Sequence, residues 1–325
     1  MEPQPDNART TIGQRLQSVS RNVLYLSLFV VVSASLIVAH LLTIRVPSEP
    51  QECTKDAYKV LRNLQPGDTI IIDTAYTNSS RGENGGEMEA VLRMAMREKV
   101  KFVLYTYAEP QCVEVAKGVI DRINEERRQS KPPELEYKEW DDYVILGFFP
   151  DGATMLQTVA SNIRDAWGPK KEKDETGAER PVFESPVLKN IQKVEDIKAY
   201  VSIAPSSVMP TIVARIQQRV PIISMITGVM FPEQFNYYKS GQLRGLINGL
   251  VGTVEFETLM EQGIDANGVV GGHAAGPPQA AAFPGEKNYA RGMDYYLAFC
   301  CAMTLLIAAI VVGNVGMFME RRRMR

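Results

Sequence analysis

Residues 73–86, with the sequence DTAYTNSSRGENGG, carry the densest set of chemically capable side chains in this chain. They combine a carboxylate, several hydroxyl groups, amides and an arginine with glycines that precede an apolar helical pattern. Such a loop can hold an anionic or polyhydroxylated ligand, and we expect backbone N–H groups at Gly85 and Gly86 to face it. An ordinary polar connection that is capped by glycine is the alternative.

The loop follows residues 69–72, a short, apolar and β-branched run that is typical of a strand buried on both faces. Ligands of open α/β sheets bind beyond the carboxyl ends of the strands, where helix N-termini offer free N–H groups. Candidate ligand-binding residues are therefore those that follow predicted strands: Asp73, Thr74, Tyr76, Asn78, Ser79, Ser80, Arg81, Gly85, Gly86, Glu109, Ser206 and Ser207. Neither nucleotide-binding glycine pattern is matched, so we predict a small anionic or polar ligand and no cofactor.

The sequence predicts no catalytic residue and no metal site. Its two histidines, His40 and His273, stand far from the predicted strand ends, and no Gly-x-Ser-x-Gly motif or Cys/His cluster is present. Catalysis by carboxylates alone, with Asp73, Glu109 or Asp151, stays open. For Cys53 and Cys112 both a disulfide and two unpaired thiols are open.

Strand and helix patterns alternate along the middle of the chain. Strands are expected at 69–72, 101–107, 143–149, 199–204 and 221–226, and helices at 54–64, 87–99, 110–128, 153–167, 207–219 and 241–262. This alternation predicts an α/β fold with a mostly parallel, doubly wound sheet of about five strands. The pattern resembles flavodoxin-like and periplasmic-binding-protein-like architectures, which implies a fold and no function. Residues 168–186 form a charged loop without apolar periodicity.

Two uncharged apolar segments, 23–44 and 295–319, flank this domain. Roughly 20 apolar residues suffice to cross a bilayer as a helix, so both segments predict transmembrane helices. The expected organisation is a basic tail (1–22), the first span, an α/β domain (45–262), a Gly/Ala/Pro-rich return segment (263–294), the second span and a basic tail (320–325).

Arginines in the two tails place both tails in the cytoplasm by the positive-inside rule, although basic residues on the domain side reduce the difference. The sequence therefore predicts an integral membrane protein, in the cytoplasmic membrane if it is bacterial, with an extracytoplasmic domain. The lipid bilayer is one expected partner. The acidic charge of the domain argues against nucleic acid.

Small residues recur at helical spacing in two places. They are Gly241, Gly245, Gly249 and Gly252 in the predicted last helix of the domain, and Ala309, Gly313 and Gly316 in the second span. Such a face lets another backbone approach closely, which predicts a homo-oligomer or contacts with other membrane subunits. Packing on the chain's own sheet, or on its own first span, is the alternative.

Three functions remain open. The leading hypothesis is a scaffold or sensor subunit of an oligomeric membrane assembly. The first alternative is a membrane-tethered module that binds a small molecule in a strand-end cleft. The second alternative is a hydrolase that uses carboxylate catalysis.

Overall fold

A computed structural model describes residues 11–42, 49–131, 133–265, 269–270 and 287–323. The chain divides into two compact units, Ser48–Gly292 and the two terminal segments Met1–Pro47 and Met293–Arg325. The return segment predicted at 263–294 lies largely outside the described residues.

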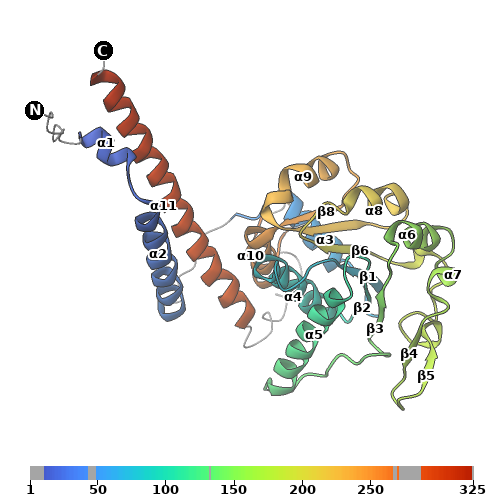
Figure 1. Cartoon of the computed structure of the whole chain (residues 1–325). Helices are drawn as coiled ribbons and strands as arrows, with labels where there is room; N and C mark the ends of the chain where they lie inside the picture. Colours follow the sequence, from blue (N-terminus) through green and yellow to red (C-terminus); the bar gives the residue numbers. More distant parts are fainter. Residues whose placement is uncertain (1–10, 43–48, 132, 266–268, 271–286, 324–325) are drawn as a thin grey trace, which may run out of the picture. The chain divides into compact units, whose positions relative to one another are not determined.

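The larger unit is an α/β domain built on a six-stranded sheet (Figure 1). Its strands and helices, in chain order, are α3 (Glu52–Arg62), β1 (Thr69–Thr74), α4 (Arg81–Arg97), β2 (Lys101–Thr106), α5 (Gln111–Gln129), β3 (Tyr143–Phe148), α6 (Gly152–Ser161), α7 (Ile163–Trp167), β4 (Lys171–Lys173), β5 (Glu179–Pro181), β6 (Tyr200–Ala204), α8 (Met209–Ile216), β7 (Ile222–Ile226), α9 (Phe231–Lys239), β8 (Gly245–Asn248) and α10 (Gly249–Gln262). Single-turn 3₁₀ helices lie at Val182–Glu184, Val194–Asp196 and Gly228–Met230.

The main sheet has the order β3-β2-β1-β6-β7-β8, and every neighbouring pair is parallel. Two apolar cores cover its faces. Side chains of α3, α4, α5 and α10 form the first core, and side chains of α6, α7 and α8 form the second. Burial on both faces explains why the strands are continuous apolar runs in the sequence. The predicted mostly parallel α/β fold is confirmed.

The direction of winding reverses between β1 and β6. From β1 the chain proceeds through β2 to β3, and from β6 it proceeds through β7 to β8 in the opposite direction. The connections after β1 and after β6 therefore leave neighbouring strand ends and diverge. This reversal is the structural feature that positions the candidate site.

Several local predictions are wrong. The sheet has six strands, because residues 245–248 form β8 where the sequence predicted the first part of a helix over 241–262. Helix α9 was not predicted, α4 begins six residues before the expected position 87, and the helix expected at 153–167 is broken at Asn162. The charged segment 168–186 contains the antiparallel pair β4 and β5.

The glycines that suggested one helical face belong to three different elements. Gly241 lies in a turn, with φ +75°, Gly245 begins β8, and Gly249 and Gly252 lie at the start of α10. A Cβ atom at Gly245 would overlap the backbone of Ala57 in α3. Gly245 therefore packs inside its own domain. These four glycines therefore do not form one helical face. The predicted contact between subunits at these residues stays a prediction, and the glycine spacing no longer supports it.

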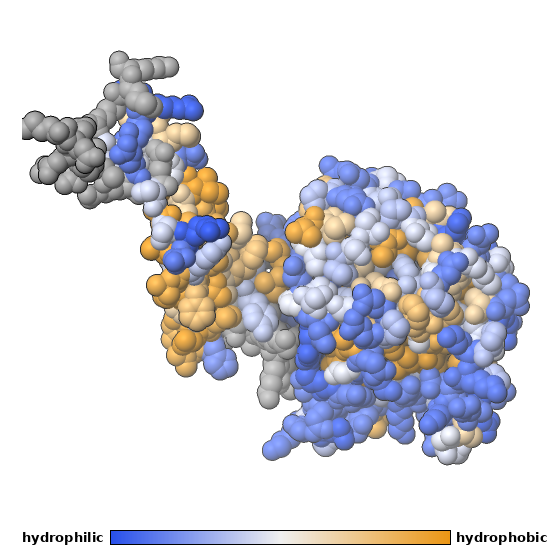
Figure 2. Space-filling model, viewed as in Figure 1, coloured by the Kyte–Doolittle hydropathy of each residue, from blue (hydrophilic) through white to orange (hydrophobic). Residues whose placement is uncertain are grey.

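The smaller unit contains α1 (Ile12–Gln17), α2 (Arg21–Leu42) and most of α11 (Lys287–Arg323). Two of its helical segments, Arg21–Leu42 and Tyr295–Arg322, are long and apolar enough to cross a membrane. Figure 2 shows hydrophobic side chains along both of them. On α11, Gly316 is buried against Gly13 of α1, Ala309 is half-buried, and a Cβ atom at Gly313 would meet nothing within 4 Å.

Candidate ligand-binding site at the carboxyl edge of the sheet

The connections after β1 and β6 begin side by side. Thr74 pairs with Ile203, and the N–H of Ala75 donates to the carbonyl of Ile203 over 2.8 Å. From there residues 75–80 lead to α4, and residues 205–208 lead to α8. Polar side chains from both connections are exposed at this edge. They are Asn78 and Ser79 from the first connection, and Ser206 and Ser207 from the second.

The first connection is ordered by its own hydroxyl groups. The hydroxyls of Thr77 and Ser79 lie 2.8 Å apart, and the N–H of Ser79 donates to Thr77 Oγ1 over 3.3 Å. Ser207 is hydrogen-bonded to Glu233 of α9. Local bonds of this kind fix the backbone at the edge of the sheet while leaving Asn78 and Ser206 exposed.

The predicted role of Gly85 and Gly86 is wrong. Both glycines lie inside α4, where their N–H groups take part in the helix, and the N–H groups of Glu83 and Asn84 already bond to the carbonyl of Ser80. The glycines instead make room. A Cβ atom on Gly85 would come within 3.0 Å of the Arg81 side chain, and one on Gly86 within 3.3 Å of Thr253 in α10.

Arg81 and Gly82 are thus the residues at the N-terminus of α4 whose N–H groups have no partner in the helix. Both residues are exposed, and the aliphatic part of Arg81 lies along the helix against Gly85. Arg81 thus begins a 17-residue helix whose positive end lies at this edge, and its side chain runs from there along the first turn of the helix.

Three other predicted residues are unsuited to direct contact with a ligand. Thr74 and Tyr76 are fully buried, and Tyr76 belongs to the core under α4 and α5. Glu109 is exposed but follows β2, one strand away from the reversal, and its carboxylate accepts a hydrogen bond from the Gln111 side chain.

Asp73 lies beneath the edge in a row of polar side chains that crosses four strands. Its neighbours in register are Tyr105 on β2 and Ser202 on β6, and Ser202 in turn pairs with Ser224 on β7. The Ser202 hydroxyl donates to Asp73 Oδ2 over 3.3 Å. The hydroxyls of Tyr105 and Tyr200 lie 2.7 Å apart beside it.

Burial raises the pKa of Asp73 to about 7, and the hydroxyls of Tyr107, Ser202 and Tyr200 offset part of that effect. Asp73 is completely buried, so these hydroxyls take the place of water around its carboxyl group. The sequence predicted Asp73 and Tyr107 at strand ends, but it missed Tyr105, Tyr200 and Ser202. Side chains alternate between the two faces of a strand, so the residues that share a face with Asp73 could be predicted only if the register of the neighbouring strands were known.

A second polar cluster was also missed. The carboxylate of Glu83 accepts the N–H of Gly228 over 2.8 Å, and Asn84 Nδ2 donates to Glu87 Oε2 over 2.7 Å. Asn84 and Glu87 are fully buried between α4 and the carboxyl ends of β7 and β8. Burial raises the pKa of Glu87 well above its ordinary value, and the negative charge of Glu83 adds to this effect. The Asn84 amide and the backbone N–H groups of Gly249 and Ile226 oppose it.

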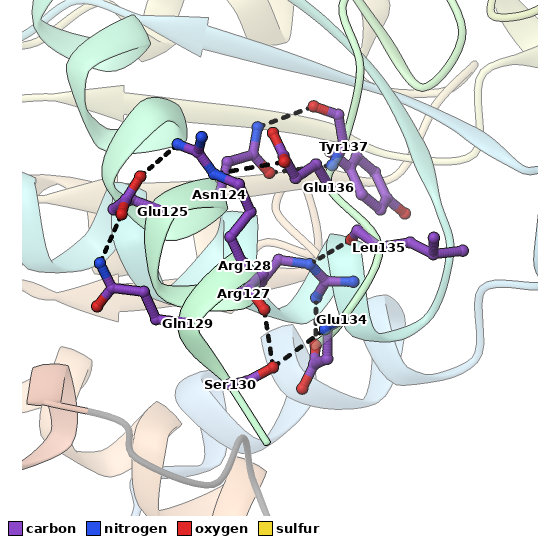
Figure 3. A network of polar contacts seen from close by, with 10 residues as sticks. All are labelled: Asn124, Glu125, Arg127, Arg128, Gln129, Ser130, Glu134, Leu135, Glu136 and Tyr137. Atoms are coloured by element: carbon purple, nitrogen blue, oxygen red, sulfur yellow. Dashed lines mark hydrogen bonds and ion pairs between the residues drawn. The ribbon is translucent and has the colours of Figure 1, made fainter. Parts of the chain in front are cut away.

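The densest network drawn in Figure 3 has a different place and role. Asn124 exchanges two hydrogen bonds with the backbone of Tyr137, and Arg127 bonds to the Leu135 carbonyl and pairs with Glu134 at 2.9 Å. These contacts hold residues 134–137 against the last turns of α5. The chain enters α5 from the carboxyl end of β2 and leaves it towards the amino end of β3, so this network lies on the side of the amino ends of the strands.

Sulfur and nitrogen ligands do not converge within the described residues. Cys53 and Cys112 are both free and buried, on α3 and α5, and burial raises the pKa of the Cys53 thiol to about 11. In that part of the chain no group of three His, Cys, Asp or Glu side chains is placed to hold a metal ion. Any ligand at the carboxyl edge would therefore be held by hydroxyl, amide, carboxylate and guanidinium groups.

No family model, curated protein or solved structure matches this chain.

Proposed function

We propose that this protein is a membrane-tethered sensor whose α/β domain binds a small polar or anionic molecule at the edge between β1 and β6. The observation that carries the proposal is the reversal of winding between these strands, with the two hydroxyl-bearing connections on either side of it. Ligands of doubly wound sheets bind at such a reversal, because diverging connections leave a crevice there.

The strand order supports the same proposal in more detail. Counted along the chain within the main sheet, the strands lie in the order 3-2-1-4-5-6, which is the order of Rossmann-type sheets. The connection after β1 lacks the Gly-x-Gly-x-x-Gly fingerprint, and Gly85 and Gly86 contact protein side chains. We therefore assign a ligand smaller than a dinucleotide.

The groups at the edge indicate the chemistry of the ligand. Arg81 and the N-terminus of α4 favour an anionic group such as a carboxylate or a phosphate. The exposed side chains of Ser79, Ser206 and Asn78 offer hydrogen bonds to hydroxyl groups. Charge and hydroxyl groups together are typical of phosphorylated or carboxylated sugars and of hydroxy acids.

Binding can be tested with the full-length protein extracted in detergent. A panel of anionic metabolites is screened for a rise in the unfolding temperature, and native mass spectrometry identifies any ligand that copurifies. We expect Arg81→Ala to reduce the ligand-induced rise by half or more without lowering the unfolding temperature of the ligand-free protein.

Arg215→Ala is the matched control, because Arg215 is an exposed arginine in the last turn of α8, at the opposite end of that helix from the β6 connection. It should respond to the ligand as the native protein does. A native protein that responds to no member of the panel, or an equal response of the Arg81 and Arg215 variants, would contradict the proposal.

The proposal includes the orientation in the membrane, with both tails in the cytoplasm and the domain outside. Lys173→Cys on β4 and Gln14→Cys on α1 are both exposed positions, and they report the two sides. In intact cells a membrane-impermeant maleimide should label the first variant and not the second. Labelling of the tail position alone would reverse the orientation.

A further inference from the structure

The polar cluster around Glu83 and Glu87 lies outside the proposed ligand site between β1 and β6. It gathers three segments beyond the ends of β7 and β8: the first two turns of α4, Gly228, and Asn248 with Gly249. A Cβ atom on Gly228 would lie 3.7 Å from Asn248 Oδ1 and 3.7 Å from Glu83 Oε2. A Cβ atom on Gly249 would overlap the Glu83 carboxylate. The three segments are therefore in close contact.

The side-chain atoms of this cluster that lack hydrogen-bond partners are all oxygen acceptors. Within the described residues, Asn84 Oδ1 and Asn248 Oδ1 are buried atoms with no hydrogen-bond partner, and the Glu87 carboxylate lies beside them, near the backbone N–H groups of Gly249 and Ile226. Asn84 and Glu87 are completely buried residues, and the bond between them holds the two side chains together. Buried acceptors without a protein partner are rare in native proteins, and a bound ion or water molecule often completes their bonding.

Charge in the cluster points to the same kind of partner. Glu83 and Glu87 are four residues apart on α4, so their side chains stand one above the other on the same helix face. The cluster holds two carboxylates and two amide oxygens, which are the ligands preferred by hard cations.

The cluster extends from the surface of the domain into its interior. Gly228 is exposed and Glu83 and Asn248 are half-buried, whereas Asn84 and Glu87 lie at the bottom. An ion that enters beside Gly228, which has no side chain, would therefore meet oxygen atoms on its way to the buried acceptors.

We propose that Glu83, Asn84, Glu87 and Asn248 bind a hard cation, with calcium as the best match. Calcium accepts six to eight oxygen ligands in flexible geometry, so backbone carbonyls and water can complete a shell that four side chains begin. Magnesium requires a stricter octahedron and gives up water reluctantly, which suits a site formed from three separate segments less well. Bound calcium would join α4 to the ends of β7 and β8.

The test uses full-length protein in detergent after treatment with a chelator. Calcium chloride is titrated in by calorimetry, and the unfolding temperature is measured with and without the metal. Magnesium chloride at equal ionic strength serves as the comparison. Saturable calcium binding and a calcium-dependent rise in the unfolding temperature are expected, with a smaller rise for magnesium.

Glu87→Gln keeps the shape of the side chain and removes a charged oxygen ligand. It should weaken calcium binding by about tenfold or more, since even indirect partners of metal ligands contribute that much. Glu255→Gln is the matched control, because Glu255 is a buried carboxylate on α10 whose oxygens already accept bonds from Gln51 and Thr54. This control should retain native calcium affinity.

Asn248→Ala provides a second variant, at a half-buried position where truncation is easier to tolerate. It should also lower the affinity if Asn248 is a ligand. A native protein that binds no calcium overturns the proposal. So does native affinity in both variants, or a rise in unfolding temperature that is the same for magnesium and persists in Glu87→Gln, because such a rise reflects ionic strength. The ligand screen with Arg81 is independent of all these outcomes.

Discussion

The polar groups at the end of α5 and those beneath the first turns of α4 both contain glutamate and asparagine, but they are paired to different degrees. In the α5 network of Figure 3, backbone and side-chain groups bond to one another, and none of its atoms is among the buried atoms without a partner. Near α4, in contrast, the buried oxygen atoms Ser80 Oγ, Asn84 Oδ1 and Asn248 Oδ1 have no hydrogen-bond partner in the described part of the chain.

This difference separates a structural role from a binding role. A closed network gains its stability from the protein alone, and water or a ligand would have nothing to add to it. Buried acceptors without a partner cost about 1–3 kcal/mol each, so a fold retains them where something else completes their bonding. By this criterion the carboxyl edge of the sheet is a candidate region for ligands and ions, and the network at the end of α5 is not.

Asp73→Asn, at the carboxyl edge of the sheet, is the change with the largest expected effect on stability. The pKa of Asp73 is raised to about 7 by burial, from an ordinary value of 3.8. Between these values the folded protein holds a proton that the unfolded chain has lost, so stability falls as pH rises through this window. Asparagine cannot ionise, so at about pH 8 the variant should be more stable than the native protein, by on the order of 4 kcal/mol at most.

Urea unfolding of the full-length protein in detergent measures this directly. Both tryptophans, Trp140 and Trp167, lie in the larger unit, so their fluorescence reports on the α/β domain. Near the low end of the window the native and Asn proteins should converge. Asp151→Asn is the control, since Asp151 is exposed and its pKa is lowered by the hydroxyl and N–H of Thr154, and it should gain no stability as pH rises. A parallel pH profile for Asp73→Asn and the native protein would show that Asp73 ionises without cost.

The same contrast explains how much of the fold the sequence could predict. The strands β1, β2, β3, β6 and β7 were predicted, because each contains an apolar run, which is buried throughout in β1, β6 and β7 and partly exposed in the edge strand β3. The strand β8 was missed, because it has four residues and starts with Gly245, whose lack of a side chain is required by contact with Ala57. Its glycine belongs to a helical spacing by coincidence, and only tertiary contacts reveal this.

The start of α4 was missed for a related reason. Gly82, Gly85 and Gly86 are poor helix formers, and local propensity therefore predicts a loop. Contacts from elsewhere override that propensity, since Gly86 accommodates Thr253 and Glu83 accepts the N–H of Gly228. The strand-end loops of the candidate site could thus be predicted from alternation alone. The buried acceptors near Glu87 could not, because they depend on the ends of two distant strands.

Asn124→Ala, in the network at the end of α5, is expected to have a smaller effect on stability. Its side chain is 8 % exposed, its Nδ2 donates to the Tyr137 carbonyl over 2.8 Å, and its Oδ1 accepts the Tyr137 N–H over 3.0 Å. Alanine leaves both backbone groups without these partners, so the domain should lose about 2–3 kcal/mol of stability in the same urea titration.

Gln129→Ala is the control for this change, because Gln129 is exposed and bonds only to the neighbouring Glu125 among the contacts of Figure 3. Its effect should stay within about 0.5 kcal/mol. Faster amide hydrogen exchange at residues 134–137 in Asn124→Ala would locate the loss at the end of α5. If the network is closed, as the hydrogen bonds indicate, the variant should retain the native response to calcium and to any ligand found in the screen. An altered response would mean that the two polar regions are coupled, and the distinction between them would then have to be abandoned.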